Sequence, residues 1–462
     1  MDIQEWDEES EGVLSDADVK LLRQLDSLYQ GATKVAIKKL SKNDRSWARP
    51  GGSHQAGFYV SDELRGDFFP ADHEIQPQER IPHILEMKIR TKWPGFIELK
   101  EMTYKRYTNK GGEAHFTVPP KSAFSEVAPA SFVVMAKKTD ADGEFFECLV
   151  VDSNAAFAYE SVERKFDLFP TFLVGVFDPP VKDAVPAKVA NVIDLLIQEF
   201  VTAAHNKTLP QLIKLYSKIP DGSAITAEAQ ATWLQGTAEK DFNPFRLEAP
   251  GNVLRKLTTE IEFEIYRAHE LRYRAAQALE IIFRDGVSPT TTQIVERVVR
   301  NFIHLYQVML NASQQRKNRV GAGFESHIQK MLIDGKIPHE EQAVVSTRRP
   351  DFVLPNKELY VAHSSDALVL AAKTTLRERW KQVPREQRNC VVYLATMDEK
   401  VTLSAVKEMA QLDIVLVVPE SLVTDKIIEY AKEPNVMTFK KFFDSEIALS
   451  RKPRWMALGA WK

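Results

Sequence analysis

Two apolar segments of the sequence are each flanked by a charged residue that could take part in catalysis. Asp351 precedes the strand-like run FVL, and Lys373 follows the apolar run ALVLAA, 22 residues later (373 − 351). Lysines avoid burial unless a nearby group needs the charge. A carboxylate beside an ammonium suits phosphodiester hydrolysis, because the carboxylate can hold Mg²⁺ and the ammonium can stabilise charge that develops on the phosphate. On this spacing alone, a structural ion pair is the alternative.

The usual nuclease motif places a second acidic residue two positions before its lysine, and this chain has Ala371 there. A replacement ligand must therefore come from another segment. Glu378 and Glu386 follow the lysine and are eight residues apart, so they lie near one face of a helix. Glu325, in the helical segment GFESHIQ, is a further candidate.

A basic cluster lies in the segment QQRKNRVGAG. Arg316, Lys317 and Arg319 lead into two glycines, Gly321 and Gly323. Basic side chains at the start of a helix can contact phosphates or guanine edges in the major groove of DNA. A solvated basic surface is the plainer interpretation.

The elements around these residues alternate between helices and strands. The segments ESHIQKML, TTLRERWKQ and LSAVKEMAQL have helical patterns, whereas PDFVL, ALVLAA, VVYLAT and IVLVVP have the length and composition of strands. This alternation predicts an α/β domain in which helices flank a mixed sheet.

Helices are also expected upstream, between about Ala187 and Leu310. One stripe of apolar residues consists of Ile261, Ile265, Ala268, Ala275, Leu279 and Ile282. A second helix is expected to begin near Thr290–Thr292 and to run through Ile294, Val298, Phe302 and Tyr306. These helices are expected to pack a connector or a subunit interface.

The first 180 residues carry short strand-like runs separated by turn signals, such as SFVVMAKK and FFECLVV, and one helix near Asp16–Tyr29. The segment Phe177–Pro186 contains three prolines and is typical of a linker. The sequence therefore predicts a multidomain α+β protein: a β domain at 1–180, a helical connector at 181–254, and an α/β domain at 255–462 that begins with helices of its own.

Composition narrows the class of protein. A chain of 462 residues is too long for one ordinary core, and its net charge of −3 means that a nucleic-acid surface must be a local patch. The two cysteines, Cys148 and Cys390, are expected in different domains, which excludes a cysteine-built zinc site and suits a reducing cytoplasm. The acidic start has no secretory pattern, and no apolar run reaches transmembrane length.

The segments RKNRVGAGFE, RRPDFV, AAKTTLRERWKQV and LATMDEKVTLSAVKEMAQLDIVLVVPESL together resemble the C-terminal catalytic domain of EcoRII-like type II restriction endonucleases, over roughly Glu262–Phe443. The resemblance implies a PD-(D/E)XK-type nuclease domain with a restriction-endonuclease-like mixed sheet. In that family the missing acid lies on the helix after the lysine, 13 residues further on (373 + 13), which is Glu386. Asp351 and Glu386 would then be Mg²⁺ ligands, Lys373 the catalytic lysine and Glu325 an accessory acid.

Two further features of the same resemblance concern basic residues. Arg377 stands where the family often has a second lysine, and an arginine can keep the positive charge but cannot transfer a proton. Arg316, Lys317 and Arg319 match the segment with which the family reads bases and phosphates.

The stretches SKNDRSWARPGGSHQAGFYV and KRYTNKGGEAHFT resemble the N-terminal DNA-binding domain of the same family, a β pseudobarrel shared with plant transcription factors of the B-three type. Taken without the resemblance, they indicate only surface loops. Ala114 and His115 depart from the family, which has arginine or lysine there. The resemblance implies DNA contacts from His54, Tyr59, Lys105, Arg106, Lys110, Glu113 and His115.

These implications give one expected function. The chain would be a prokaryotic, cytoplasmic, Mg²⁺-dependent type II restriction endonuclease that cuts double-stranded DNA as a homo-oligomer, a dimer or a tetramer. It would require more than one bound site, and it would be either effector-activated or cut at a shifted position (type IIS). The alternative is a sequence-specific DNA-binding regulator that does not cleave.

Overall fold

The structure is a computed structural model. It describes residues 16–49, 56–166, 168–169, 171–180, 187–283, 289–305, 323–342, 350–376, 380, 390–424 and 428–461. Two compact units make up the chain: the first is Met1–Ala184 with Lys426–Ile428, and the second is Val185–Asp425 with Glu429–Lys462. Within the described residues, no helix has both the length and the apolar content needed to cross a membrane.

The first unit is built on a nine-stranded sheet. Its strands are β1 (Lys34–Lys39), β2 (Gly57–Val60), β3 (Gln76–Gln78), β4 (Ile81–Lys92), β5 (Lys100–Tyr107), β6 (Glu113–Thr117), β7 (Phe132–Asp140), β8 (Gly143–Val151) and β9 (Val174–Phe177). Its helices are α1 (Asp16–Tyr29), α2 (Lys42–Ser46) and α3 (Ala156–Lys165), with short 3₁₀ turns at Asp62–Leu64, Asp72–Glu74 and Lys121–Ala123. The helix predicted at Asp16–Tyr29 is confirmed.

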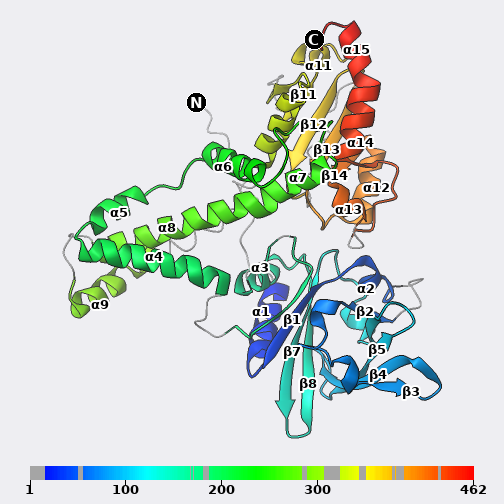
Figure 1. The fold of residues 1–462 in the computed structure, drawn as a ribbon, viewed down its shortest axis with the longest axis vertical. Coiled ribbons are helices and arrows are strands. Elements are labelled where there is room, and N and C mark those ends of the chain that lie inside the picture. The colour runs from blue at the N-terminus through cyan, green and yellow to red at the C-terminus, as the bar shows by residue number, and fades with distance from the viewer. Residues whose placement is uncertain are drawn as a thin grey trace. The chain divides into compact units, whose positions relative to one another are not determined.

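The strand order is β2-β6-β5-β4-β8-β7-β1-β9, with β3 paired to β4. All pairs are antiparallel except β4 with β8, where Thr91 lies opposite Phe146. Helices α1 and α3 cover one face of the strands β1, β7 and β8 (Figure 1), where Leu25, Val35 and Tyr159 are buried. The strands β4, β5, β6 and β2 bury their apolar face in a separate aromatic core, and their other face therefore remains available for polar residues.

The second unit begins with helices and continues with an α/β fold. Its helices are α4 (Ala187–His205), α5 (Leu209–Leu215), α6 (Gly222–Gln235), α7 (Pro250–Lys256), α8 (Glu262–Ile282), α9 (Thr291–Arg300), a helix over 323–334, α11 (Lys357–Val361), α12 (Leu403–Gln411), α13 (Glu420–Thr424), α14 (Phe439–Lys441) and α15 (Lys452–Ala457), with π-helical segments at Leu257–Ile261 and Phe442–Arg451. Its strands are β10 (Glu340–Glu341), β11 (Phe352–Leu354), β12 (Leu368–Lys373), β13 (Val391–Thr396), β14 (Ile414–Val418) and β15 (Val436–Thr438).

The sheet of the second unit is mixed, as predicted. Its order is β10-β11-β12-β13-β14-β15, antiparallel as far as β12 and parallel from β12 onward. The four segments expected to be strands are β11, β12, β13 and β14. Parallel strands buried on both faces explain why these segments are continuous apolar runs without alternation.

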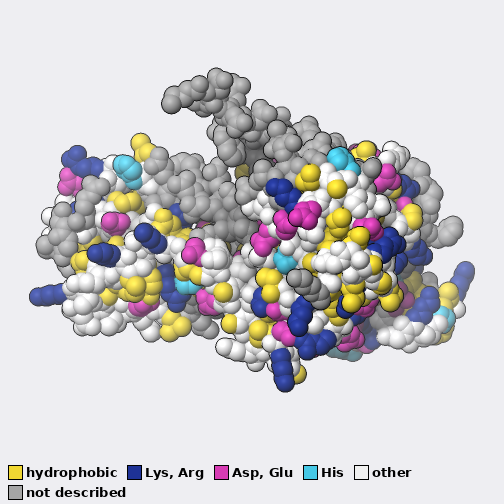
Figure 2. All heavy atoms as spheres, turned by 90° about the horizontal axis from the view of Figure 1, so that it is seen from above, with side chains coloured by type: hydrophobic (Ala, Val, Ile, Leu, Met, Phe, Trp, Pro, Cys, Tyr) yellow, Lys and Arg dark blue, Asp and Glu magenta, His cyan; other side chains and the backbone are white. Residues whose placement is uncertain are grey.

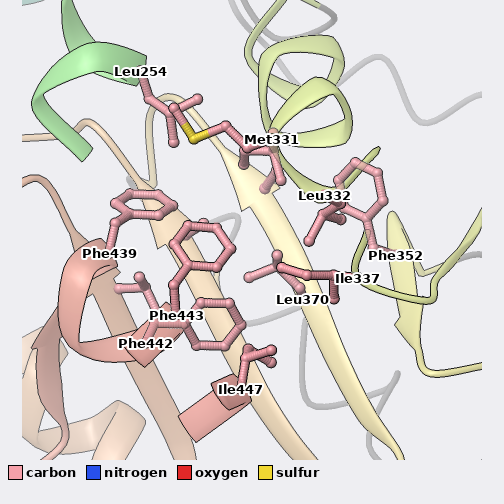
Figure 3. Close-up of a cluster of buried hydrophobic side chains, with 14 of the residues drawn as sticks. Leu254, Met331, Leu332, Ile337, Phe352, Leu370, Phe439, Phe442, Phe443 and Ile447 are labelled. Carbon is pink, nitrogen blue, oxygen red and sulfur yellow. The ribbon is translucent and has the colours of Figure 1, made fainter. Parts of the chain in front are cut away.

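The core of this unit fixes the position of β12. Figure 3 shows Phe439, Phe442 and Phe443, from α14 and the π-helical segment, packed beside Leu370 of β12, with Met331 of the helix over 323–334 nearby. All five side chains are fully buried. Lys373 is therefore the last residue of a strand that packing holds on both faces.

The upstream helices follow the predicted stripe in part. Figure 1 shows α4 running along the long helix α8, and Leu279 packs with buried Phe200 of α4. The predicted N-terminal cap of α9 is confirmed, because the Thr290 side chain accepts the N–H of Gln293. The helix predicted to run on through Phe302 is interrupted at one residue: α9 ends at Arg300, and the side chain of Asn301 donates to the carbonyl of Arg297. Residues 302–305 are helical again, so Phe302 is helical as predicted, and its side chain is 64% exposed. The expected Tyr306 lies outside the described residues.

Candidate active site and nucleic-acid interface

The sheet brings Asp351 and Lys373 together. Strands β11 and β12 are antiparallel, with Phe352 opposite Leu370, and continuing this register places Asp351 opposite Ala371. Because side chains two residues apart on a strand share a face, Asp351 and Lys373 lie on the same side of the sheet. Lys373 Nζ donates a hydrogen bond to Asp351 Oδ2 at 2.8 Å. The side chains are 29% and 13% exposed, respectively, so the pair lies at an accessible edge.

The carboxylate of Asp351 is oriented by the backbone as well. The N–H of Ala372 donates to the same oxygen, Oδ2, at 2.7 Å. Oδ1 has no hydrogen-bond partner among the described residues. A carboxylate oxygen held in this way is the hard ligand that Mg²⁺ prefers, so the donor chemistry fits a divalent cation.

The described residues supply one acidic ligand of such a site. Ala371, directly across from Asp351, contributes only a methyl group where the usual motif has an acid. No group of three His, Cys, Asp or Glu residues suited to a metal occurs within the described part of the chain. A complete cation site at this edge would therefore need a ligand from a residue beyond those described, such as Glu386.

The turn after Lys373 is tied to the neighbouring strand by Asp398, which the sequence did not single out. The end of β12 is level with the end of β13, where Lys373 lies opposite Thr396. Asp398 Oδ2 accepts the backbone N–H of Leu376 at 2.8 Å, and Oδ1 accepts that of Lys400 at 2.9 Å. Burial raises the pKa of Asp398, although these two N–H groups act in the opposite direction. The only sequence signal was an acidic residue shortly after an apolar strand.

Glu325 lies in the first turn of the helix over 323–334 and is half-buried. That helix is anchored by a buried polar chain that the sequence also did not reveal. His327 Nε2 is 2.9 Å from Glu262 Oε2, and His327 Nδ1 is 3.2 Å from the amide nitrogen of Gln230. A side chain at Gly323 would collide with the Glu262 carboxylate and would displace it from His327. The chain Gln230–His327–Glu262 thus fixes the start of this helix.

Several predicted residues cannot be placed. His54, Arg316, Lys317, Arg319, Arg377, Glu378 and Glu386 lie outside the described residues.

In the first unit, four of the predicted DNA-contacting residues share one face of the sheet. Strand pairing places His115 between Tyr59 on β2 and Lys105 on β5, and it places Glu113 opposite Tyr107. His115 Nε2 is 2.9 Å from Glu113 Oε1. The rings of Tyr59 and Tyr107 meet the His115 ring edge-on, at centroid distances of 5.8 Å and 5.9 Å. Tyr59, Lys105, Glu113 and His115 thus form one polar face, called here the Tyr59–His115 face.

Arg106 does not belong to that face. Adjacent strand residues point to opposite sides, so Arg106 lies beside Ala114 on the side of the aromatic core. Its guanidinium makes an ion pair with Asp72, and burial and the charge of Arg65 lower its pKa. Lys110 is exposed in the turn between β5 and β6, with its ammonium 5.3 Å from the centre of the Tyr107 ring. The predicted set therefore divides between two faces of the sheet.

A buried ion pair supports the Tyr59–His115 face from below. Lys38 Nζ donates to Asp44 Oδ2 at 2.5 Å, and the same oxygen accepts the N–H of Ser41 at 2.9 Å. Asp44 Oδ1 accepts the backbone N–H of Tyr59 at 2.9 Å. One carboxylate thereby joins β1, α2 and β2. Because β2 carries Tyr59, this pair sets the position of one edge of the face.

Comparison with known proteins shows which proteins the second unit and the whole chain are similar to. Residues 280–443 match the family model described as EcoRII C terminal. This part of the chain is therefore similar to EcoRII C-terminal domains. Asp351, Lys373 and Asp398 all lie within the residues that match this family model.

Among curated proteins, the chain is 29% identical over 161 residues to the type II restriction enzyme SsoII of Shigella sonnei, which covers 32% of this chain and 52% of that protein. The chain thus spans about half the length of SsoII. It is 25% identical over 406 residues to the type II restriction enzyme EcoRII of Escherichia coli, covering 84% and 88% of the two chains. Among solved structures, metal-depleted Ecl18kI in complex with uncleaved, modified DNA has 22% identity and a TM-score of 0.43, over 52% of this chain and 84% of that one.

The buried Lys38–Asp44 pair generates a stability prediction. In Asp44→Asn, Lys38 keeps its charge in a site where its side chain is only 9% exposed. Leaving a buried charge unpaired costs about 3–5 kcal/mol, so we expect the first unit to lose stability by that amount. Hydrogen exchange of peptides from β1 and β7 measures the change. The matched control is Asp26→Asn, which breaks the exposed pair with Lys165 and should cost ~1 kcal/mol or less.

The same prediction has a definite pH dependence. Burial, the largest influence, raises the pKa of Asp44, but the Lys38 ammonium and the N–H groups of Tyr59 and Ser41 together hold it below its ordinary value. A carboxyl group whose pKa is lowered by folding stabilises the protein above its unfolded pKa of about 3.9, and this contribution is lost as the pH falls through the folded pKa. The two proteins should therefore differ fully at pH 7 and converge only in acid. A difference that grew on acidification would contradict this assignment.

Proposed function

We propose that the chain is a Mg²⁺-dependent type II restriction endonuclease that recognises a specific sequence in double-stranded DNA and hydrolyses its phosphodiester bonds. The observation that carries the proposal is the 2.8 Å contact between Lys373 and Asp351 at the edge of the mixed sheet, within the residues that match the EcoRII C-terminal family model. The relatives named as type II restriction enzymes support it, since one of them aligns over 84% of this chain.

Each residue of the proposed centre has a distinct part. Asp351 and Glu386 would hold Mg²⁺, which supplies charge neutralisation and an activated water when it is bound. The Lys373 ammonium stabilises negative charge on the phosphate, because it lies at the rim of the sheet and Asp351 keeps it oriented. Glu325 would be an accessory acid, and Arg377 a second cation near the phosphate.

The first unit is the proposed recognition domain, a B-three-like pseudobarrel. The Tyr59–His115 face combines hydrogen-bonding side chains that suit base edges with Lys105, whose ammonium suits a phosphate. Lys110 and His54 would extend this surface, and Arg316, Lys317 and Arg319 would contact DNA from the nuclease unit. Arg106 is better assigned to support of the β5–β6 turn, because it faces the core side and its guanidinium lies against Gly112.

Assembly follows from the chemistry of cutting two strands. One active site cuts one strand, so a double-strand break calls for a symmetric pair of catalytic domains, in a homodimer or a tetramer. Two DNA-binding units in each chain favour cleavage with more than one site bound, because linkage raises the effective concentration of the second site. The enzyme would be either effector-activated or type IIS, and it would act in a prokaryotic cytoplasm. Plasmids with one target and with several test the requirement: equal cleavage rates would exclude it.

A second candidate is a sequence-specific DNA-binding regulator that does not cleave. It is favoured by one observation, that the position across from Asp351 holds Ala371 and lacks the usual acid. The two functions differ in whether the unaltered protein cuts DNA when Mg²⁺ is added.

The proposed role of Lys373 predicts a separation of cleavage from binding. We expect Lys373→Ala to lower the cleavage rate by about 10²-fold or more, since it removes a group that stabilises charge in the transition state. Binding to target DNA without Mg²⁺ should stay within twofold. The matched control is Lys407→Ala, on the exposed surface of α12, which should cleave normally. Sequencing the ends produced by the unaltered protein gives target and offset; absence of any cut with Mg²⁺ would favour the regulator.

The proposed phosphate contact of Lys105 predicts a change in salt dependence. Figure 2 shows Lys and Arg interspersed with Asp and Glu on the face that it displays, and the net charge is −3, so DNA binding must rest on local contacts. Lys105→Ala should weaken binding to all sequences and reduce the slope of log K against log salt by about 1. Lys165→Ala, on α3 of the same unit, is the control and should leave the slope unchanged. An unaltered slope for Lys105→Ala would exclude the contact.

A further inference from the structure

We propose that Asp398 is a positioning residue for Lys373: its carboxylate holds the turn after β12 and so keeps the Lys373 ammonium in place against Asp351. The inference rests on the proposed nuclease function, because it concerns how that reaction's lysine is held. Within the described part of the chain, no hydrogen bond or ion pair joins Asp398 to Asp351 or Lys373, and the effect of Asp398 is transmitted by the backbone.

The turn is fixed at two points. At its beginning, Lys373 is the last residue of β12 and pairs in register with Thr396 of β13. At its end, the N–H of Leu376 donates to Asp398 Oδ2 at 2.8 Å, and the Leu376 side chain is buried. Only Thr374 and Thr375 lie between these points. The direction in which the Lys373 side chain leaves the sheet therefore depends on where Asp398 holds Leu376.

Asp398 is itself held rigidly. Its N–H donates to Thr396 Oγ1 at 3.1 Å, and its carbonyl accepts the Tyr430 hydroxyl at 3.3 Å. The next residue, Glu399, is paired with Arg255 of α7 at 3.3 Å. Asp398 is only 8% exposed. The Asp398 carboxylate is thus not a mobile surface group. Its position is fixed by contacts with β13 and, through Glu399, with α7.

The chemistry of the group explains why an acid is present in this buried place. Its Oδ2 accepts the N–H of Leu376 from the turn after β12, and its Oδ1 accepts the N–H of Lys400, two residues further on in its own loop. An asparagine has one accepting oxygen and one donating amide, so it must give up one of the two bonds. Burying a carboxylate is unfavourable, as the raised pKa of Asp398 reflects, and an uncharged residue would be cheaper if one bond were enough. The double acceptor therefore does two things at once: one oxygen fixes the carboxylate within its own loop, and the other joins that loop to the turn after β12.

The position of the turn matters for the neighbouring pair of proposed catalytic residues, Lys373 and Asp351. The Lys373–Asp351 contact is 2.8 Å long and depends on a long, flexible side chain that starts at the last position of the strand. Misplacing a reacting or stabilising group by about 1 Å can lower a rate by ~10²-fold. Loosening the turn should thus reduce the rate of the chemical step and leave DNA affinity intact, since no described DNA-contacting residue lies on it.

The test compares Asp398→Asn with Asp334→Asn. Asp334 also accepts a backbone N–H from a distant segment, that of Phe242 at 2.9 Å, and it lies in the same unit. Three quantities are measured for each variant: the single-turnover cleavage rate with Mg²⁺, the affinity for target DNA without Mg²⁺, and hydrogen exchange at Leu376. We expect Asp398→Asn to cleave about 10- to 100-fold more slowly with affinity within twofold, and to exchange faster at Leu376. Asp334→Asn should change neither rate nor exchange there.

The possible failures are distinguishable. If the unaltered protein cleaves and Asp398→Asn cleaves equally fast, the inference is overturned and the proposed function stands. If the unaltered protein does not cleave, the proposed function is overturned and the inference falls with it. A fall in affinity equal to the fall in rate, or an equal loss in Asp334→Asn, would indicate general destabilisation and also overturn it. Should Asp398→Asn not fold, Tyr430→Phe removes one support of the same residue, and an unchanged rate in that variant would overturn the inference.

Discussion

The register between β11 and β12 is the constraint on which the proposed site depends. It places Asp351 across from Ala371 and on the same face as Lys373, close enough for the 2.8 Å contact. A shift of one residue would move Asp351 to the opposite face of the sheet. The aromatic side chains Phe442 and Phe443, packed against β12, oppose such a shift because they match only one set of buried positions. The Asp351–Lys373 pair at the rim is thus held in place by apolar packing beneath it.

Much of this arrangement could be predicted from the sequence because strands buried on both faces leave a plain signal. The apolar runs identified four strands, and a charge at the end of two of them identified Asp351 and Lys373. The division between Lys105 and Arg106 could also have been predicted, since neighbouring residues of a strand point to opposite faces. The interruption of the predicted helix at Asn301 was missed, because apolar periodicity does not reveal a side-chain hydrogen bond such as the one that Asn301 donates to the carbonyl of Arg297.

The residues that sequence reasoning missed have a common physical character. Asp44, Glu262 and Asp398 are buried carboxylates, and each bonds groups from segments that are distant in the chain or in different elements. A single acidic residue in a sequence does not indicate that its side chain is buried, because burial depends on tertiary contacts with segments that are distant in the chain. Each of them joins segments next to a proposed functional surface or helix start. In both units, buried carboxylates hold the segments that carry the proposed functional side chains at the surface.

The mutual neutralisation of Lys373 and Asp351 has a consequence for how such an enzyme would meet its substrate. A lysine and an aspartate in contact form a dipole with no net charge, and its field falls off faster with distance than that of a lone ammonium. Before Mg²⁺ binds, a passing polyanion is therefore attracted weakly to the pair itself. DNA must therefore bind first to other surfaces of the protein. The sugar-phosphate backbone reaches Lys373 only after the duplex has bound there. Recognition of the DNA sequence would then precede cleavage for electrostatic reasons alone, without any conformational change that gates the active site.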